Sequence, residues 1–325
     1  MIDAAKDFQG ETPPTPLPRT RRGRQPARVH GILPLNKGAG MTSFDAVRAV
    51  RRILGERRVG HAGTLDPSAT GLLPICVGQA TRLVNFLHQQ PKRYHCVVRL
   101  GERSDTLDLE GEVTRSGDAS HVGEPVVRAA LVRFEGDIQQ VPPMHSAVRR
   151  DGRHLYELAR EGVEVEREPR TVHIGSIRVV AFRPGAVAEV ELDVVSGKGA
   201  YMRVLAADLG DVLGTGGLLS WLERTAYGSL TVAESVTLEQ LEAMDDPASA
   251  LLGPEVAVDW MPRVDLPPQL AVQVRRGQSV WLARVPEPRP RGAVRAHGPE
   301  GELICVGELT GTMLRPTKVL ATGGA

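Results

Sequence analysis

The chain has 325 residues, and its 40 basic and 39 acidic residues give a formal net charge of +1. A chain of this length exceeds the size at which a single hydrophobic core usually divides, so we expect two domains. The balanced charge excludes a uniformly basic nucleic-acid-binding protein, and any RNA-binding surface must come from local clusters of basic residues.

The cysteines and the apolar runs narrow the class of protein further. The three cysteines have neither metal-ligand spacing nor a disulfide framework. No apolar run approaches the roughly 18 residues of a membrane span, and the N-terminus has no apolar signal core. We therefore expect a cytoplasmic protein with no metal, and the absence of a nucleotide-cradling loop predicts no cofactor.

Residues 1–29 combine several prolines and arginines with almost no apolar side chains, which predicts a disordered basic tail. Its arginines either contact RNA phosphates or are solvated without a role. The folded sequence starts near His30 with a strand over 31–37, followed by a glycine-rich loop and a helix. Thr42 or Ser43 can cap this helix, and Gly55 ends it. Its apolar stripe is expected to be buried and consists of Phe44, Val47, Val50 and Leu54.

Residues 60–71 have the sequence GHAGTLDPSATG and hold one carboxylate, Asp66, among turn residues. Three glycines permit backbone conformations and close approaches that a Cβ would prevent, and Pro67 restricts the backbone next to the acid. A loop so constrained can aim Asp66 at a ligand. The alternative is a surface turn in which Asp66 only bonds to its own backbone.

The rest of the first 250 residues alternates helices and strands without a regular βαβ period, which predicts an α+β fold on a mixed or antiparallel central sheet. We expect helices over 80–87, 126–134, 156–160 and 200–213, and strands over 94–100, 187–195 and 218–227. A break falls near 245–265. The apolar stretches 270–274, 279–285, 293–296 and 303–309 then predict a small C-terminal β-barrel.

The segment 60–71 resembles the active-site motif of the TruB family of tRNA pseudouridine synthases, G-H-x-G-x-L-D-P-x-A-T-G, at every fixed position. The resemblance implies that Asp66 is the catalytic residue and that His61 lies beside the target nucleotide. Residues 196–203, SGKGAYMR, resemble the S-x-G-x-Y-I-R motif of the family, whose arginine pairs with the catalytic acid. We therefore pair Arg203 with Asp66 and expect the cation to lower the pKa of the carboxyl. The alternative is that Arg203 lies on a helix surface.

The same resemblance assigns further residues to the site. Tyr94, in a K-R-Y motif, is expected to stack on an extruded base, although alone it reads as a half-buried strand residue. Tyr201 supports the active site. Lys37, in the segment LNKGAGMTS, is structural or faces RNA. The remaining RNA contacts are expected from Arg93, His145, Arg149, Lys198 and Arg224.

This chain departs from the family pattern at four positions, which puts the local contacts there in doubt. Asn36 replaces Asp and Gly38 replaces Pro in the segment around Lys37. His145 stands where relatives carry an aromatic residue in P-P-x-[YF]-S-A, and Glu223 replaces the first Arg of L-R-R-T.

The resemblance predicts three regions: the tail 1–29, a pseudouridine synthase domain 30–255 with an RNA-closing insertion at about 139–170, and a PUA-like RNA-binding domain 256–325. An unrelated stabilising barrel is the alternative for the last region. The implied reaction converts the T-loop uridine of tRNA (U55) to pseudouridine, with the T-arm stem-loop as partner and the protein as a monomer. A guide-RNA-dependent synthase of the dyskerin type and a tRNA-folding chaperone without catalysis are the alternatives.

Overall fold

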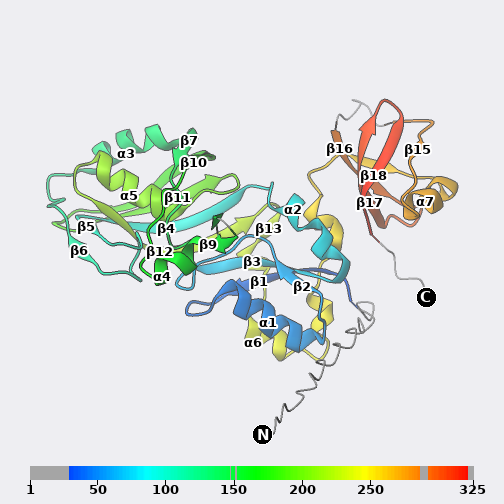
Figure 1. The fold of residues 1–325 in the computed structure, drawn as a ribbon, viewed down its shortest axis with the longest axis horizontal. Coiled ribbons are helices and arrows are strands. Elements are labelled where there is room, and N and C mark those ends of the chain that lie inside the picture. The colour runs from blue at the N-terminus through cyan, green and yellow to red at the C-terminus, as the bar shows by residue number, and fades with distance from the viewer. Residues whose placement is uncertain (1–28, 147, 151, 286–291, 321–325) are drawn as a thin grey trace, which may run out of the picture.

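The computed structural model describes residues 29–146, 148–150, 152–285 and 292–320. The predicted tail therefore lies outside the described residues, apart from Val29. The molecule is elongated, with a large sheet and its helices at one end of the long axis and a small β domain at the other (Figure 1). Among the helices of the described residues, none has both the length and the apolar character needed to cross a bilayer.

The predicted α+β class is confirmed by a nine-stranded mixed sheet. Its main path runs in the order β1-β3-β12-β4-β11-β10-β7, with β2 paired to β3 and β13 paired to β12. The pair of β3 and β12 is parallel, and the other pairs of this sheet are antiparallel. The strands are β1 (Gly31–Lys37), β2 (Val59–His61), β3 (Thr70–Val77), β4 (Lys92–Leu100), β7 (Gly136–Gln140), β10 (Arg170–Arg183), β11 (Ala188–Ser196), β12 (Gly217–Tyr227) and β13 (Leu230–Thr231).

Helices cover this sheet in two groups. Helix α1 (Ser43–Leu54) packs near β2, whereas α3 (Glu124–Leu131) and α5 (Met202–Val212) share a core with β4 and β11. Shorter elements complete the domain: η1 (Gly78–Leu83), α2 (Val84–Leu87), β5 (Glu102–Arg103), β6 (Thr114–Arg115), η2 (Val132–Phe134), η3 (Val232–Glu234), α6 (Leu238–Glu242), η4 (Pro247–Ala250) and η5 (Pro254–Ala257). The predicted helices over 80–87, 126–134 and 200–213 are thus confirmed, the first as a 3-10 turn followed by a short α-helix.

Helix α1 begins and ends where the sequence predicts. Thr42 caps it in a capping box with Asp45, and Gly55 ends it in the left-handed conformation with φ 61°. The prediction that Phe44 belongs to the core is wrong, because its side chain is 58% exposed. The buried face is centred on Ser43, Val47 and Val50, and Phe44 lies about 100° around the helix from Ser43.

The 14-residue strand β10 is absent from the sequence-based prediction. Its register against β11 shifts between Ile174 and Ser176 and again between Val179 and Ala181. Each irregularity interrupts the two-residue alternation of apolar and polar side chains that reveals a strand in a sequence. The strand is therefore recognised only from its pairing with β11 and β7 in the structure.

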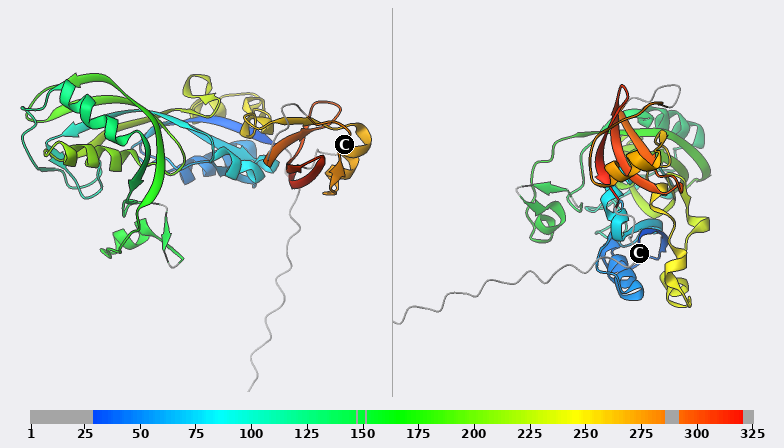
Figure 2. Two further views of the ribbon diagram at one scale, coloured as in Figure 1. Left: turned by 90° about the horizontal axis from the view of Figure 1, so that it is seen from above. Right: turned by 90° about the vertical axis from the view of Figure 1, so that its right-hand side faces the viewer.

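An insertion leaves the sheet after Gln140, at the end of β7, and returns at Arg170, the start of β10. It contains β8 (Arg149–Arg150), β9 (Arg153–His154) and the helix α4 (Leu155–Arg160), which confirms the predicted short helix. The left view of Figure 2 shows this insertion projecting well away from the layer of the sheet.

The C-terminal region forms a separate five-stranded sheet in the order β14-β16-β17-β18-β15. The strands are β14 (Arg263–Asp265), β15 (Val280–Trp281), β16 (Gly292–His297), β17 (Leu303–Thr310) and β18 (Met313–Val319). The predicted strand at 270–274 is wrong, because these residues lie in helix α7 (Pro268–Arg275). An apolar run of five residues fits a strand or a buried helical turn equally well, and here Ala271 and Val274 face the core at helical spacing.

The small β domain packs directly against the larger one. Leu303, Val306 and Leu320 belong to the same apolar cluster as Leu83 and Leu87 of the η1–α2 segment. The Arg82 guanidinium also donates to the Val319 carbonyl at 2.6 Å. A continuous core of this kind fixes the two sheets relative to one another.

Candidate active site

Asp66 lies on the loop that connects β2 to β3, and glycines shape this loop. Gly63 has φ 74°, and an added Cβ would lie 3.1 Å from the Tyr227 ring. Gly71 has φ 95°, and a Cβ there would lie 2.5 Å from the Arg224 carbonyl oxygen. Both positions therefore require glycine for conformation and for space, as the sequence predicts for this loop.

Helix α1 holds the residue before Asp66. The Ser43 hydroxyl accepts a hydrogen bond from the Leu65 amide at 2.9 Å and donates to the Leu65 carbonyl at 3.0 Å. The Pro67 carbonyl, on the other side of Asp66, accepts from the Gly40 amide at 2.9 Å. The backbone is thus fixed on both sides of the carboxylate.

Two buried cations lie beneath the loop. Lys37 is fully buried, and its Nζ donates to the carbonyls of Gly38, Met41 and Pro67 at 2.9, 3.0 and 3.2 Å. This geometry favours the structural one of the two roles predicted for Lys37. Burial lowers the pKa of Lys37 to about 8, and the nearby Asp66 carboxylate opposes this effect.

Arg224 was expected to contact RNA, but the structure places it under the same loop. Its side chain is buried, and Nε donates to the Leu72 carbonyl at 2.7 Å while Nη2 donates to the Gly63 carbonyl at 3.0 Å. These contacts tie the loop to β12. The geometry therefore gives Arg224 a supporting role.

Arg203 pairs with Asp66, as the motif predicts. Its Nε lies 3.0 Å from Asp66 Oδ2, and the Arg203 side chain is only 5% exposed, against 34% for Asp66. Its Nη1 donates to the Thr106 carbonyl at 3.0 Å and its Nη2 to the His145 carbonyl at 2.8 Å. The guanidinium is therefore held at several points, and the carboxylate is left open to solvent on one side.

Arg203 acts on the pKa of Asp66 in the expected, lowering direction, but the net change is upward. Burial raises the pKa of Asp66 above its usual value, and the nearby carboxylates of Asp108 and Glu110 raise it further. Arg203 acts in the opposite direction but does not outweigh them. The motif shows the cation but neither the packing around Asp66 nor the two neighbouring carboxylates.

Asp108 is a site residue that sequence reasoning missed. Its side chain is buried, and Oδ2 lies 3.5 Å from Arg203 Nε, so the guanidinium faces two carboxylates. Asp108 Oδ1 also accepts from the Thr106 hydroxyl at 2.5 Å and from the Glu110 amide at 3.0 Å. The available signal was the cluster of acidic residues in the segment 104–112.

A cavity of about 240 Å³ opens above Asp66. Of the residues predicted for the site, those that line it are Asp66, Tyr94, Lys198, Tyr201, Arg203 and Arg224. The sequence analysis did not assign three further lining residues, His88, Lys92 and Tyr227. Lys92 Nζ lies 4.6 Å from the centroid of the Tyr227 ring and donates to the His88 carbonyl at 2.7 Å.

The other predicted residues lie outside this lining. His61 is partly buried in β2, and burial lowers its pKa. Arg93 is exposed on the face of β4 opposite Tyr94, as strand alternation requires. His145 is half-buried, and Arg149 is exposed on the insertion, where its Nε donates to His154.

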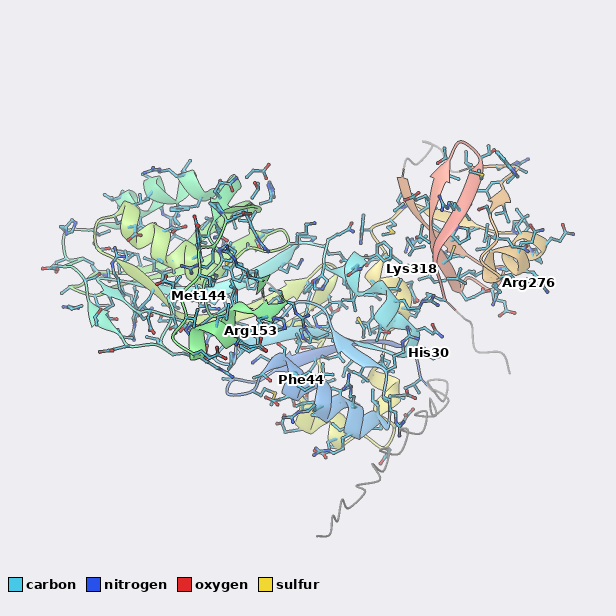
Figure 3. The ribbon with its side chains drawn as sticks, in the orientation of Figure 1. His30, Phe44, Met144, Arg153, Arg276 and Lys318 are labelled. Atoms are coloured by element: carbon cyan, nitrogen blue, oxygen red, sulfur yellow. The ribbon has the colours of Figure 1, made fainter. Side chains whose placement is uncertain are left out.

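Figure 3 labels Met144 and Arg153 on this insertion and Phe44 at the start of α1.

Residues 51–202 match the family model described as TruB family pseudouridylate synthase, N-terminal domain. The chain is 48% identical over 251 residues to the tRNA pseudouridine synthase B of Symbiobacterium thermophilum, covering 77% of this chain and 83% of that one. It is 44% identical over 310 residues to the protein of the same name from Ralstonia nicotianae, covering 93% and 98%.

Solved structures with the same fold include a protein in an H/ACA ribonucleoprotein bound to a substrate RNA containing 2′-deoxyuridine. The match has a TM-score of 0.68 at 24% identity and covers 90% of this chain and 85% of that one. A chain of a Cbf5–Nop10–Gar1 complex matches with a TM-score of 0.66 at 25% identity, covering 89% and 84%. These likenesses confirm the predicted fold class, including a small C-terminal β domain.

Proposed function

The chain belongs to the TruB family of pseudouridylate synthases, and from this premise we propose that it isomerises the T-loop uridine of tRNA, U55, to pseudouridine. Relatives named tRNA pseudouridine synthase B support this substrate, because they align with most of the chain at 41–48% identity. The observation that carries the proposal is the pair of Asp66 and Arg203 at 3.0 Å on the wall of a cavity.

The reaction needs access to both the sugar and the base of one nucleotide. The C1′–N1 glycosidic bond breaks, the uracil turns while it is bound, C5 forms a new bond to C1′, and the proton on C5 is released. A cavity of about 240 Å³ admits one base and excludes a duplex, so the target uridine is extruded from the RNA before it reacts. Asp66 then acts on the sugar, as a nucleophile at C1′ or as a base at C2′.

The residues around Asp66 each have a separate role in this proposal. Arg203 keeps Asp66 ionised against the burial that raises the pKa of this carboxyl. Tyr94 lines the cavity from β4 and offers a ring on which the base stacks. Lys198 is exposed at the same cavity and is free to approach a phosphate. His61, in β2 at the base of the loop, shapes the space that the extruded base leaves.

We assign recognition of the T-arm RNA to surfaces outside the cavity. The insertion at about 139–170 carries exposed Arg149 and closes over the T-arm, and Arg93 adds a contact from β4. The domain 30–255 performs catalysis and the domain 256–325 is a PUA-like RNA-binding module. We propose that the protein acts as a monomer in the cytoplasm, without metal or cofactor.

Release of tritium from uracil C5 tests the reaction, because pseudouridine formation must expel that label to water. The substrate is an unmodified T-arm stem-loop labelled at C5, incubated with the protein alone. We expect release by the wild type and none above background by Asp66→Asn. Lack of release by the wild type with tight RNA binding would overturn stand-alone catalysis and favour a guide-dependent synthase or a chaperone. Release by Asp66→Asn would remove the catalytic role from this residue.

A further inference from the structure

Gln140, the last residue of β7, makes a paired contact with the backbone of Tyr201. Its side chain is only 1% exposed. Gln140 Oε1 accepts from the Tyr201 amide at 2.9 Å, and Gln140 Nε2 donates to the Tyr201 carbonyl at 3.2 Å. The backbone amide and carbonyl of Tyr201 are therefore both bonded to one buried side chain, and the carbonyl also accepts the helical hydrogen bond from the Leu205 amide at 3.1 Å.

The position of this contact matters because helix α5 begins one residue later. Tyr201 occupies the N-cap position, where no side chain caps the helix, and Arg203 is the second helical residue. The amide and carbonyl of Tyr201 thus fix the direction in which the first turn of α5 starts. Gln140 supplies the buried acceptor for the Tyr201 amide at this helix start.

A second contact joins the same two segments. After Gln140 the chain runs into the insertion, and five residues later the His145 carbonyl accepts from Arg203 Nη2 at 2.8 Å. The stretch 140–145 therefore bonds to the backbone before Arg203 and to the guanidinium itself. Any displacement of this stretch would move the cation that faces Asp66.

We propose that Gln140 is a positioning residue that sets Arg203 against Asp66 and thereby couples the base of the insertion to the catalytic carboxylate. This inference rests on the proposed function of Asp66. Gln140 lies outside the cavity lining, so its effect passes through Tyr201 and Arg203. It accounts for a buried amide that neither fills an apolar core nor reaches the substrate.

The coupling has a consequence for the ionisation of Asp66. The charged or titratable groups that act on this carboxylate come from three segments and are Arg203 and Tyr201 at α5, Asp108 and Glu110 in the loop after β5, and Lys37 in β1. Arg203 is the cation in direct contact with it. A looser Arg203 leaves burial and the two carboxylates less opposed, so the pKa of Asp66 rises.

Replacement of Gln140 by Met tests the proposal, because Met has a similar volume and makes neither hydrogen bond. We expect the single-turnover rate of tritium release to fall about tenfold or more, since small displacements of a reacting group are costly. The acid limb of the pH–rate profile should move to higher pH. The dissociation constant for the T-arm RNA, measured by filter binding, should change by no more than about twofold, because Gln140 is buried.

Gln139→Met is the matched control. Gln139 is the preceding residue of β7, is exposed, and donates to the Thr171 hydroxyl at 2.8 Å. The control should keep the wild-type rate and pH profile. Equal effects of the two substitutions, or a loss of thermal stability by Gln140→Met with an unchanged rate per folded molecule, would overturn the positioning role.

Amide hydrogen exchange adds a measurement that needs no activity. The Tyr201 amide should exchange faster in Gln140→Met than in the wild type, and Gln139→Met should leave it unchanged. Unchanged exchange in Gln140→Met would show that the contact does not hold the start of α5, and the proposal would fail. Absence of tritium release by the wild type would instead refute the proposed function, which the same assay reports separately.

Discussion

Replacement of Arg203 by Met removes a buried guanidinium with four partners. Two of them are the carboxylates of Asp66 and Asp108, with oxygens 3.0 and 3.5 Å from Nε, and two are the carbonyls of Thr106 and His145 at 3.0 and 2.8 Å. Met has no group that donates to any of them. The substitution therefore leaves two carboxylates facing each other without a cation.

The expected cost follows from these contacts. Breaking a buried ion pair by removing one partner costs about 3–5 kcal/mol of folding free energy. The lower part of this range applies here, because the Asp66 side chain is 34% exposed and water can solvate it. The rate of tritium release should fall by at least about 100-fold, since Asp66 loses both the group that positions it and the cation that favours its ionised form.

Urea unfolding and single-turnover kinetics measure the two effects in one set of proteins. The destabilisation should shrink at acid pH, because a protonated Asp66 no longer needs a counter-ion. Arg203→Lys keeps the charge but not the planar set of donors, and it should fall between wild type and Arg203→Met in both measurements. A stable Arg203→Met protein with a near-normal rate would refute the pairing as the basis of catalysis.

Three further predictions concern side chains around the same sheet. Lys37→Met should cost about 1–3 kcal/mol in urea unfolding, because three partly buried carbonyls lose their donor. RNA affinity in filter binding should stay unchanged, and weakened RNA binding by a fully folded variant would restore the RNA-facing role. Glu110→Gln keeps an acceptor for the Ser68 amide at 3.0 Å but removes a charge that raises the pKa of Asp66. Its pH–rate profile should therefore show an acid limb at lower pH, and an unmoved limb would contradict this. Burial opposes protonation of His95, but two flanking carboxylates outweigh it and raise its pKa above 6.5. The stability that protonated His95 gains from the two carboxylates is present below pH 6.5 and is lost as pH rises through the folded-state pKa. The melting temperature of His95→Gln should therefore lie below that of wild type at pH 6 and approach it at alkaline pH.

The sequence predicts the candidate catalytic residues of this protein better than it predicts the residues and elements that surround them. The loop around Asp66 and its pairing with Arg203 could be predicted, because both lie in short motifs that resemble those of the TruB family. Asp108 could not, because nothing in a loop of acidic residues shows which carboxylate turns inward. The helix at 268–275 was missed because five apolar residues do not distinguish a strand from a helical turn.

Lys37 and Arg224 show a second limit of sequence reasoning. Arg224 was predicted to contact RNA, and Lys37 either to contact RNA or to be structural, but a backbone carbonyl satisfies the same donors as a phosphate. In this structure both cations are buried and bind carbonyls of the loop and of the adjoining strands. The distinction depends on which side of the loop the side chain occupies, and local sequence does not specify this.

The two cations also bear on the balance of charge around Asp66. Asp66, Asp108 and Glu110 bring three carboxylates close together, an arrangement that raises the pKa of Asp66 and opposes its ionisation. Lys37 and Arg224 place positive charge directly beneath the same loop, and the attraction between Lys37 and Asp66 acts on both groups. Lys37 thus offsets part of the cost of placing these acids together, and both cations hold the loop by its carbonyls. Because the donors of Lys37 and Arg224 are bonded to the backbone, we expect exposed cations such as Lys198 to make the contacts to RNA phosphates that the proposed function requires.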